Sequence, residues 1–124
     1  IRINNEKFRL YGIDAPETKQ YCKNARNKRY ACGKMATQAL REKIGQSPVR
    51  CVRKSTDRYQ RTVAVCFIDN EDLNAWMVEN GYALAYTAYS KDYVLQELWA
   101  RQAKTGIWQG TFDAPWKWRK RHRF

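Results

Sequence analysis

Two carboxylates lie three residues apart in the stretch RLYGIDAPE, residues 9–17, where an expected strand ends. The chain carries 24 Lys and Arg against 12 Asp and Glu, so an acidic pair is unusual in this background. Asp14 can offer oxygen ligands to a hard cation, together with backbone carbonyls and waters. Glu17 can take the proton from an attacking water, an effect worth roughly 10²–10⁴ in rate. Arg9, on the same strand, suits the charge that builds on a phosphate.

A second arginine is expected to complete this set. Arg61 follows a hairpin turn in TDRYQR, where it could reach the same phosphate from the opposite side. Carboxylates and arginines together suffice for hydrolysis of a phosphodiester. The alternative for DAPE alone is a plain turn, with Asp14 capping backbone amides and Glu17 exposed.

Other chemistries are excluded by what the sequence lacks. His122 is the one histidine, which rules out an RNA-cleaving mechanism that uses two histidines. Paired cysteines would rule out a Cys–His nucleophile. The sequence contains no P-loop and no dinucleotide-binding fingerprint.

The net charge of +12 predicts a polyanionic partner. A domain with a pI near 9.8 attracts nucleic acid, anionic membrane or heparin-like polymer, and a merely soluble cationic surface is the alternative. The basic tail, residues 111–124, has its cations interleaved with Trp116 and Trp118, which suits phosphate contacts plus stacking. We favour the alternative for this tail, in which the tryptophans dock on the body and the charges face solvent.

No apolar run approaches the ~18 residues of a membrane span, so we expect none. A cationic membrane-active protein is also disfavoured, because no helix pairs a basic face with a long apolar one. The chain opens with Ile1 and shows no signal-peptide pattern, which we interpret as a processed or truncated protein.

Four cysteines, with no CxxC, predict two disulfides rather than a zinc site. In a hairpin with the two-residue loop Arg58-Tyr59, Cys51 faces Cys66 directly, at a separation close to that of a disulfide. Cys22 and Cys32 then remain to staple the loop between them. The alternative is four reduced thiols in a cytosolic protein, but we favour a secreted or periplasmic location.

The hydrophobic pattern predicts the elements that position these residues. A hairpin over residues 1–14 turns at Asn4-Asn5-Glu6, a helix spans 35–44, and a second hairpin spans 48–68. Two further helices are expected at about 72–80 and 92–104; the second of these is predicted to bury Val94, Leu95, Leu98 and Trp99. The order predicts one α+β domain, residues 1–124, built as an OB-type five-stranded barrel with about three helices.

Two motifs in order resemble the staphylococcal nuclease (thermonuclease) family. RLYGIDAPET is similar to the family's strand ending in Asp-x-Pro-Glu-Thr, and TDRYQRTVAVCF is similar to its Asp-Lys/Arg-Tyr-Gly-Arg hairpin. NAWMVENGYA and the late GIW also match, so the resemblance covers about residues 6–108. The tail APWKWRKRHR resembles that of secreted bacterial members.

The resemblance implies an OB-fold nuclease that uses Ca²⁺, acts on DNA and RNA through attack of water, and leaves 3′-phosphate ends. By position, Arg9 and Arg61 match the phosphate-binding arginines and Glu17 matches the general base. Asp14 matches a calcium-binding carboxylate, and Ala15 falls where a backbone carbonyl binds the metal. Positions that contact the terminal phosphate and the nucleotide match Arg58, Tyr59, Tyr86 and Tyr89.

Two departures from the family pattern bear on the site. The family's second metal carboxylate lies upstream of the opening hairpin, and no such residue is present, so we expect the first strand of the barrel to be missing from this chain. Gln60 stands where the family has Gly, and a positive φ there would strain the turn.

The main alternative is a non-enzymatic nucleic-acid-binding module with the same barrel and a degraded metal site. The set Arg9, Asp14, Glu17 and Arg61 argues against it, because a pure binder gains nothing from two acids facing a polyanion. The missing upstream acid argues for it. Either way, we expect a monomer whose partner is DNA or RNA.

Overall fold

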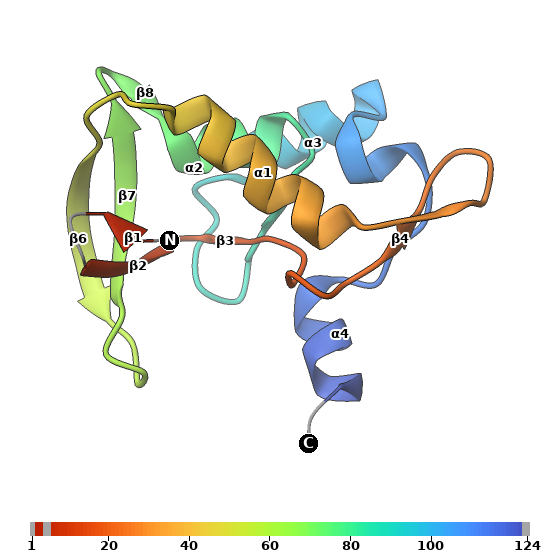
Figure 1. The fold of residues 1–124 in the computed structure, drawn as a ribbon, viewed down its shortest axis with the longest axis horizontal. Helices are drawn as coiled ribbons and strands as arrows, with labels where there is room; N and C mark the ends of the chain where they lie inside the picture. The colour runs from red at the N-terminus through yellow and green to blue at the C-terminus, as the bar shows by residue number, and fades with distance from the viewer. Residues whose placement is uncertain (1, 4–5, 123–124) are drawn as a thin grey trace.

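The computed structural model of this chain describes residues 2–3 and 6–122. Its elements, in chain order, are β1 (Arg2–Ile3), β2 (Glu6–Leu10), β3 (Ile13–Asp14), β4 (Cys22–Lys23), β5 (Arg29–Tyr30), α1 (Cys32–Ile44), β6 (Arg50–Thr56), β7 (Thr62–Ile68), β8 (Glu71–Asp72), α2 (Leu73–Glu79), β9 (Leu84–Ala85), α3 (Val94–Ala103), the 3₁₀ helix η1 (Gly106–Gln109) and α4 (Pro115–Arg121). In Figure 1, α1, α2 and α3 lie on one side of β3, and α4 lies on the other. Asn4 and Asn5 of the expected first turn lie outside the described residues, while Glu6 already belongs to β2.

The main sheet has five strands, in the order β1-β2-β7-β6 with β8 also paired to β7. β2 runs parallel to β7, whereas β6 and β7 form an antiparallel hairpin. The α+β class is therefore confirmed, but the pairing of the described strands does not close this sheet into a barrel. The reason lies at Gly12, whose φ of +75° turns the chain after β2, so that Ile13 and Asp14 pair with β9 in a separate small sheet.

The β6–β7 hairpin places Cys51 opposite Cys66, and the two form a disulfide. The predicted two-residue loop is wrong: Thr56 pairs with Thr62, so the connection is longer. A bulge between Arg53 and Ser55 shifts the register back by one residue, which is why the cysteines still face each other. The second expected disulfide, Cys22–Cys32, is also present.

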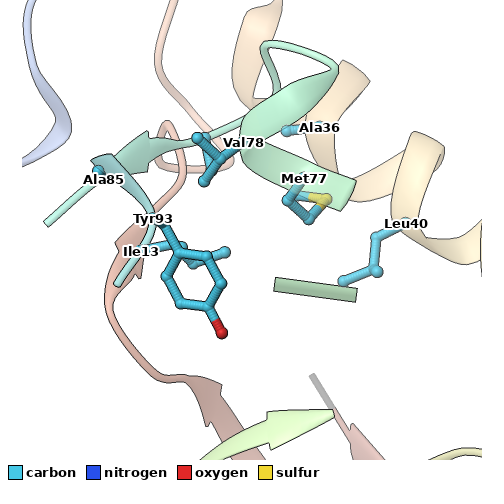
Figure 2. Close-up of a cluster of buried hydrophobic side chains, with 8 residues drawn as sticks. Ile13, Ala36, Leu40, Met77, Val78, Ala85 and Tyr93 are labelled. Atoms are coloured by element: carbon cyan, nitrogen blue, oxygen red, sulfur yellow. The ribbon is translucent and has the colours of Figure 1, made fainter. Parts of the chain in front are cut away.

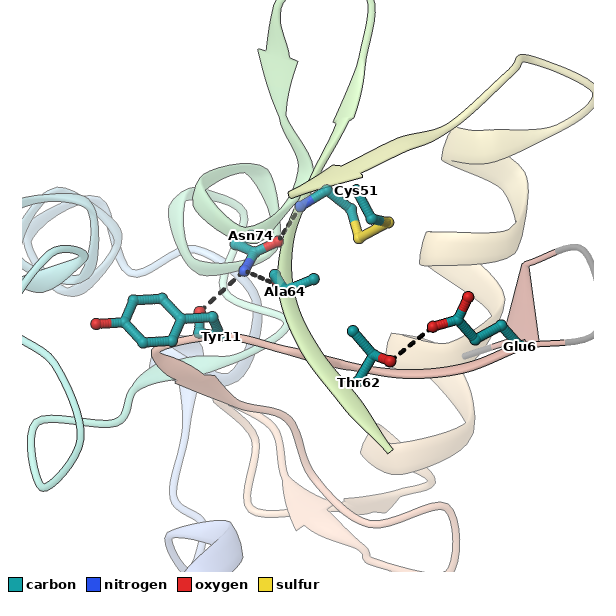
Figure 3. Close-up of a disulfide and its surroundings, with 7 residues drawn as sticks. Glu6, Tyr11, Cys51, Thr62, Ala64 and Asn74 are labelled. Carbon is teal, nitrogen blue, oxygen red and sulfur yellow. Dashed lines mark hydrogen bonds between the residues drawn. A yellow bond between two sulfur atoms is a disulfide. The ribbon is translucent and has the colours of Figure 1, made fainter. Parts of the chain in front are cut away.

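A buried amide ties three elements together. Asn74, at the start of α2, has no exposed surface and accepts a hydrogen bond from the N–H of Cys66 at 3.2 Å. Its Nδ2 donates to the carbonyls of Ala64 at 3.2 Å and Tyr11 at 2.9 Å (Figure 3). The end of β2, the middle of β7 and α2 are therefore held at one point, just ahead of the turn that leads to Asp14.

The largest core cluster lies where α1 and α2 meet β3 and β9 (Figure 2). Its buried members are Ile13, Ala36, Leu40, Met77, Val78, Ala83, Ala85 and Tyr93. A second cluster, of Ala64, Cys66 and Leu73, packs against Phe8 and Leu10 of β2. A third surrounds the Cys22–Cys32 disulfide and includes Trp108, Phe112 and Trp116 at its edge.

The predicted inward face of the third helix is wrong. Val94, Leu95, Leu98 and Trp99 have exposed fractions between 41% and 52%. The buried positions are instead Tyr93 and Ala100, and Glu97 turns inward because its Oε1 accepts a hydrogen bond from the N–H of Ala85 at 3.0 Å. Hydrogen bonding to β9 and close packing of a small residue thus set the rotation of α3, rather than its apolar stripe.

The tail contains a helix that the hydrophobic pattern did not predict. α4 begins with the buried Pro115 at its first position, where the fixed φ of proline favours helix initiation. The described residues thus form four α-helices rather than about three. None of these helices is long and apolar enough to cross a membrane.

Removing the buried amide should be costly. Asn74→Ala removes the side-chain partner of the Cys66 N–H and of the Tyr11 carbonyl, whereas the Ala64 carbonyl still accepts from the N–H of Tyr11 at 2.8 Å; each buried group left unpaired costs about 1–3 kcal/mol. We therefore expect the free energy of unfolding to fall by roughly 2–4 kcal/mol in urea denaturation. Asn70→Ala, in the exposed turn after β7, is the matched control and should change it little. Equal stability of the two variants would contradict the role of Asn74.

The hairpin disulfide should contribute measurably to stability. Its cysteines are 15 residues apart, and closing such a loop stabilises a fold by about 3 kcal/mol. The variant Cys51→Ser, Cys66→Ser should lose about that amount in urea unfolding, with a further loss on reduction of Cys22–Cys32. Thiol titration of the wild-type chain in denaturant without reductant should find no free thiol; four reactive thiols would overturn both bridges.

Candidate active site

Asp14 and Glu17 are held by a tight stretch between β3 and α1. Pro16 is buried and ends β3, and the N–H of Gln20 donates to the carbonyl of Glu17 at 2.7 Å. The N–H of Glu17 in turn donates to Oε1 of Gln20 at 3.2 Å. A Cβ at Gly33 would collide with the Glu17 carbonyl, so α1 can start against this turn only because that position is glycine.

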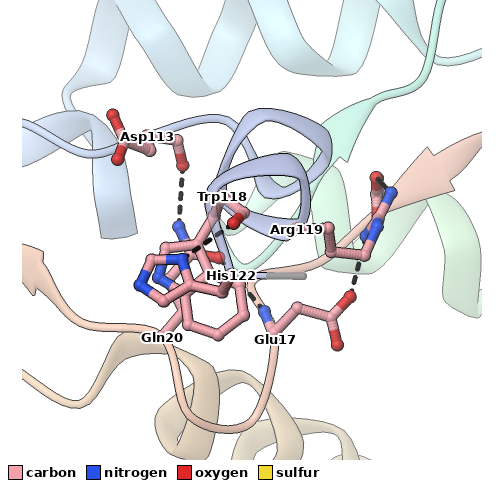
Figure 4. A network of polar contacts seen from close by, with 7 residues as sticks. Glu17, Gln20, Asp113, Trp118, Arg119 and His122 are labelled. Carbon is pink, nitrogen blue, oxygen red and sulfur yellow. Dashed lines mark hydrogen bonds and ion pairs between the residues drawn. The ribbon is translucent and has the colours of Figure 1, made fainter. Parts of the chain in front are cut away.

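Gln20 extends this support to the tail. Its side chain is fully buried, and its Nε2 donates to the carbonyl of Asp113 at 2.7 Å (Figure 4). One side chain therefore joins the turn that carries Glu17 to the segment that leads into α4.

Arg9 and Arg61 come from neighbouring strands. Arg9 pairs with Val63 in the parallel register of β2 and β7, and Arg61 lies just before β7 begins. Together with Asp14 and Glu17, they line one open cavity of about 630 Å³. The backbone turn at Gly12 and the parallel pairing thus bring four residues from two distant motifs to one place. Ala15 also lines this cavity.

The loop before β7 holds Arg61 through Asp57. The Asp57 carboxylate accepts hydrogen bonds from the N–H groups of Tyr59 and Arg61 at 2.9 Å each, and from Nε of Arg61 at 2.8 Å. Desolvation raises the pKa of Asp57, but these hydrogen bonds outweigh it, so the pKa is lowered overall. Gln60 adopts a φ of +65° in this loop, the left-handed conformation for which glycine is favoured.

The four predicted nucleotide-contact residues lie outside the cavity lining. Tyr59 is 64% exposed at the hairpin tip, with the Arg58 guanidinium 5.1 Å from its ring centroid. Tyr86 lies near the site, because the Arg9 guanidinium is 5.8 Å from its ring centroid. Tyr89 is 70% exposed and meets Tyr86 edge to face at 4.7 Å.

Sequence reasoning missed one residue of the site, Arg119 on α4. Its Nη1 donates to Oδ1 of Asp14 at 2.9 Å and to Oε1 of Glu17 at 2.8 Å, and its Nη2 donates to Oδ2 of Asp14 at 2.6 Å (Figure 4). The Asp14 side chain is only 7% exposed, so this guanidinium is its main compensating charge. The hydrogen bond to Asp14 is the largest cause that raises the pKa of Arg119, against the opposing effect of burial.

Trp116 reaches the site from the same helix. Its ring stacks on Tyr86 with centroids 5.0 Å apart and an interplanar angle of 9°. The prediction that tail tryptophans dock while the charges face solvent is therefore right for Trp116 and wrong for Arg119. Spacing of three residues puts both side chains on one face of a helix, a signal that becomes visible only once α4 is known.

The donor set suits a hard divalent cation. Asp14 and Glu17 already converge on a single cationic atom, Nη1 of Arg119, and carboxylate oxygens are the ligands that such cations prefer. In the described part of the chain, no group of three or more His, Cys, Asp and Glu side chains gathers to hold a metal. The available donors are therefore the two carboxylates and nearby carbonyls such as that of Ala15.

Comparison with known proteins identifies the relatives of this arrangement. The family model described as staphylococcal nuclease homologue matches residues 7–110. An uncharacterized endonuclease of Haemophilus influenzae is 38% identical over 120 residues, covering 94% of this chain and 62% of that protein. The succinoglycan biosynthesis protein ExoI of Rhizobium meliloti is 37% identical over 112 residues, covering 88% and 59%.

A micrococcal nuclease of Shigella flexneri is 33% identical over 136 residues, covering 97% of this chain and 72% of that protein. The chain thus spans about three-fifths of the first two relatives and nearly three-quarters of the third. Both motifs of the cavity fall inside the matched range. The chain belongs to the staphylococcal nuclease homologue family.

Proposed function

We propose that this protein is a nuclease that hydrolyses phosphodiester bonds of DNA or RNA. The observation that carries the proposal is the convergence of Arg9, Arg61 and the Asp14–Glu17 pair on one cavity, in a chain of this family. Relatives named as nucleases and endonucleases support it.

In this mechanism Glu17 is the general base. Its carboxylate takes a proton from a water that attacks phosphorus, and the bond from phosphorus to the 5′ oxygen breaks. The released 5′ oxygen takes a proton from solvent, which leaves a 3′-phosphate and a 5′-hydroxyl. Arg9 and Arg61 donate hydrogen bonds to the phosphoryl oxygens on which negative charge accumulates. Asp57 orients Arg61 for this task through the contact to its Nε.

The cation that we propose for this site is Ca²⁺, which Asp14 and the Ala15 carbonyl would hold. When bound, such an ion polarises a phosphoryl oxygen as a Lewis acid. Asp14 is prepared for this role by its burial and by the β3–β9 pairing, which holds its backbone rigidly.

The exposed aromatic and basic residues around the cavity suit the rest of a nucleic-acid strand. We propose that Arg58 and Tyr59 at the hairpin tip contact the terminal phosphate. Tyr86 and Tyr89 would stack against a base, since aromatic faces bind bases with little sequence preference.

The remaining features are proposed from family membership and from the disulfides. We infer that the fold is of the OB type that the family implies. We also infer one domain over residues 1–124, with a basic tail at 111–124, and a monomeric protein. Two disulfides support a secreted or periplasmic location, because such bonds persist in oxidising compartments.

A non-enzymatic nucleic-acid-binding module is the second candidate. The observation that favours it is Arg119, which neutralises both acids and so lets the cavity present a cationic surface to a polyanion. The two candidates differ in turnover, not in binding.

The general-base role predicts a large and selective loss of activity. Glu17→Gln keeps the shape and can still accept from Arg119, but it cannot take a proton, so cleavage of single-stranded DNA should fall by roughly 10²–10⁴. Binding of the same DNA should stay nearly unchanged. Glu79→Gln, on the exposed side of α2, is the matched control and should cleave normally.

The assay should be run with calcium and with chelator. Cleavage that requires calcium and is lost only in Glu17→Gln supports the enzyme. Equal cleavage by both variants would remove Glu17 from the base role, and binding without cleavage by the wild-type chain would favour the binding module.

Binding should depend steeply on salt, because each phosphate contact releases counterions. Using Glu17→Gln to prevent turnover, the slope of log K against log salt on single-stranded DNA should shrink by about 0.7 in the further variant Arg61→Gln, which removes one phosphate contact. Lys104→Gln, exposed at the end of α3, removes the same charge away from the cavity and serves as control. An affinity that is insensitive to salt would contradict the polyanion substrate.

A further inference from the structure

α4 makes two chemically different contacts with the proposed site. Arg119 binds the carboxylates of Asp14 and Glu17, and Trp116 stacks on Tyr86. The first contact places a cation where the proposed mechanism needs a metal ion. The second contact places the Trp116 indole on Tyr86, where a nucleobase of the substrate is proposed to stack.

The contact to the carboxylates leaves little room for another cation. Both oxygens of Asp14 accept from Arg119, and the Asp14 side chain is almost fully buried beneath it. Oε1 of Glu17 accepts from the same Nη1, so one of its oxygens is engaged as well. A metal ion that binds Asp14 has to share these oxygens with the guanidinium, and the repulsion between two cations at this distance makes them compete for the site.

The stacking of Trp116 on Tyr86 likewise competes with the binding of a nucleotide. Trp116 lies parallel to Tyr86 and covers one face of its ring, while Tyr89 meets that ring edge to face. A base that stacks on the covered face has to replace the indole. The Arg9 guanidinium lies 5.8 Å from the centroid of the Tyr86 ring, so this ring adjoins the phosphate-binding side of the cavity.

One short helix carries both contacts, so they are expected to form and break together. α4 spans only Pro115–Arg121, and its other basic side chains, Lys117, Lys120 and Arg121, are exposed. A nucleic-acid strand would attract these charges outward at the same time as its phosphates compete for Arg119. Binding of a nucleic-acid strand therefore favours dissociation of α4 from the cavity.

We propose that α4 is an autoinhibitory cover, in which Arg119 stands in for the divalent cation and Trp116 for a nucleobase until both ligands displace the helix. This inference rests on the proposed nuclease function, but its core is a competition that is measurable without any cleavage: Arg119 and a divalent cation compete for Asp14 and Glu17.

The test measures Ca²⁺ binding by isothermal titration calorimetry on the intact chain, without nucleic acid. Arg119→Gln should bind Ca²⁺ about tenfold more tightly than the wild-type chain, within the usual range of coupling between linked sites. Arg121→Gln removes the same charge from the same helix, but its partner is Asp113 at 2.9 Å, so its affinity should stay within about twofold of wild type. Equal affinities of all three proteins would overturn the cover.

Trp116→Ala tests whether the helix moves as a unit. It changes no charge, yet it should tighten Ca²⁺ binding several-fold, because α4 loses its stacking contact with Tyr86. An unchanged affinity in Trp116→Ala, beside a tighter one in Arg119→Gln, would reduce the device to a local ion pair and overturn the cover.

Two further measurements keep the result interpretable. Arg119→Lys keeps the charge but not the planar fork, so its Ca²⁺ affinity should fall between those of wild type and Arg119→Gln. Cooperative thermal unfolding of each variant checks that the substitutions leave the fold intact. In the cleavage assay, Arg119→Gln should reach half-maximal rate at about tenfold less calcium.

The two hypotheses fail in different ways. Tighter Ca²⁺ binding in Arg119→Gln without cleavage by any protein would keep the competition and reject the nuclease. Normal calcium-dependent cleavage by wild type with unchanged Ca²⁺ affinity in Arg119→Gln would keep the nuclease and reject the cover, and a loss of cleavage in that variant would make Arg119 a substrate-contacting residue instead.

Discussion

A carboxylate with almost no access to water needs a cation beside it, and Asp14 is such a carboxylate. Burying an unpaired charge costs far more than one hydrogen bond recovers, so a fold that buries Asp14 must supply a positive partner. Here that partner comes from residue 119, at the far end of the chain. This contact holds α4 against the cavity, and Trp116 of the same helix stacks on Tyr86 beside it.

The backbone positions of Asp14 and Glu17 are set by neighbouring residues that do not belong to the acidic pair. Asn74 pins the end of β2 ahead of Gly12, Gln20 holds the turn that carries Glu17, and Gly33 lets α1 pack directly on that turn. None of these three residues can do chemistry on a phosphate. They set the direction in which the carboxylates point. The side-chain amides of Asn74 and Gln20 and the absence of a side chain at Gly33 therefore matter as much here as the charged groups.

Much of the site could be predicted because its parts are local motifs. Arg9 with Asp14 and Glu17 lie in one stretch, and Asp57 with Arg61 lie in one loop, so residue types and short spacings identify them. The pairing of Cys51 with Cys66 also follows from hairpin geometry, although the bulge near Lys54 was needed to correct a wrong loop. Arg119 could not be predicted in the same way, since it is one of 24 cations and meets the acids only through long-range docking. The rotation of α3 was missed for a related reason: hydrophobic periodicity takes no account of the hydrogen bond between Glu97 and Ala85 that turns the helix.

The parallel pairing of β2 with β7 also orders the assembly of the protein in time. Phe8 and Thr62 are neighbours in space but far apart along the chain, whereas the β6–β7 hairpin joins residues close in sequence. Closing a long loop costs more entropy than closing a short one, so we expect the hairpin to form first and β2 to dock on it afterwards. On this order Arg9 and Arg61 meet late in folding, and the candidate site consists of two separate halves until β2 docks on β7.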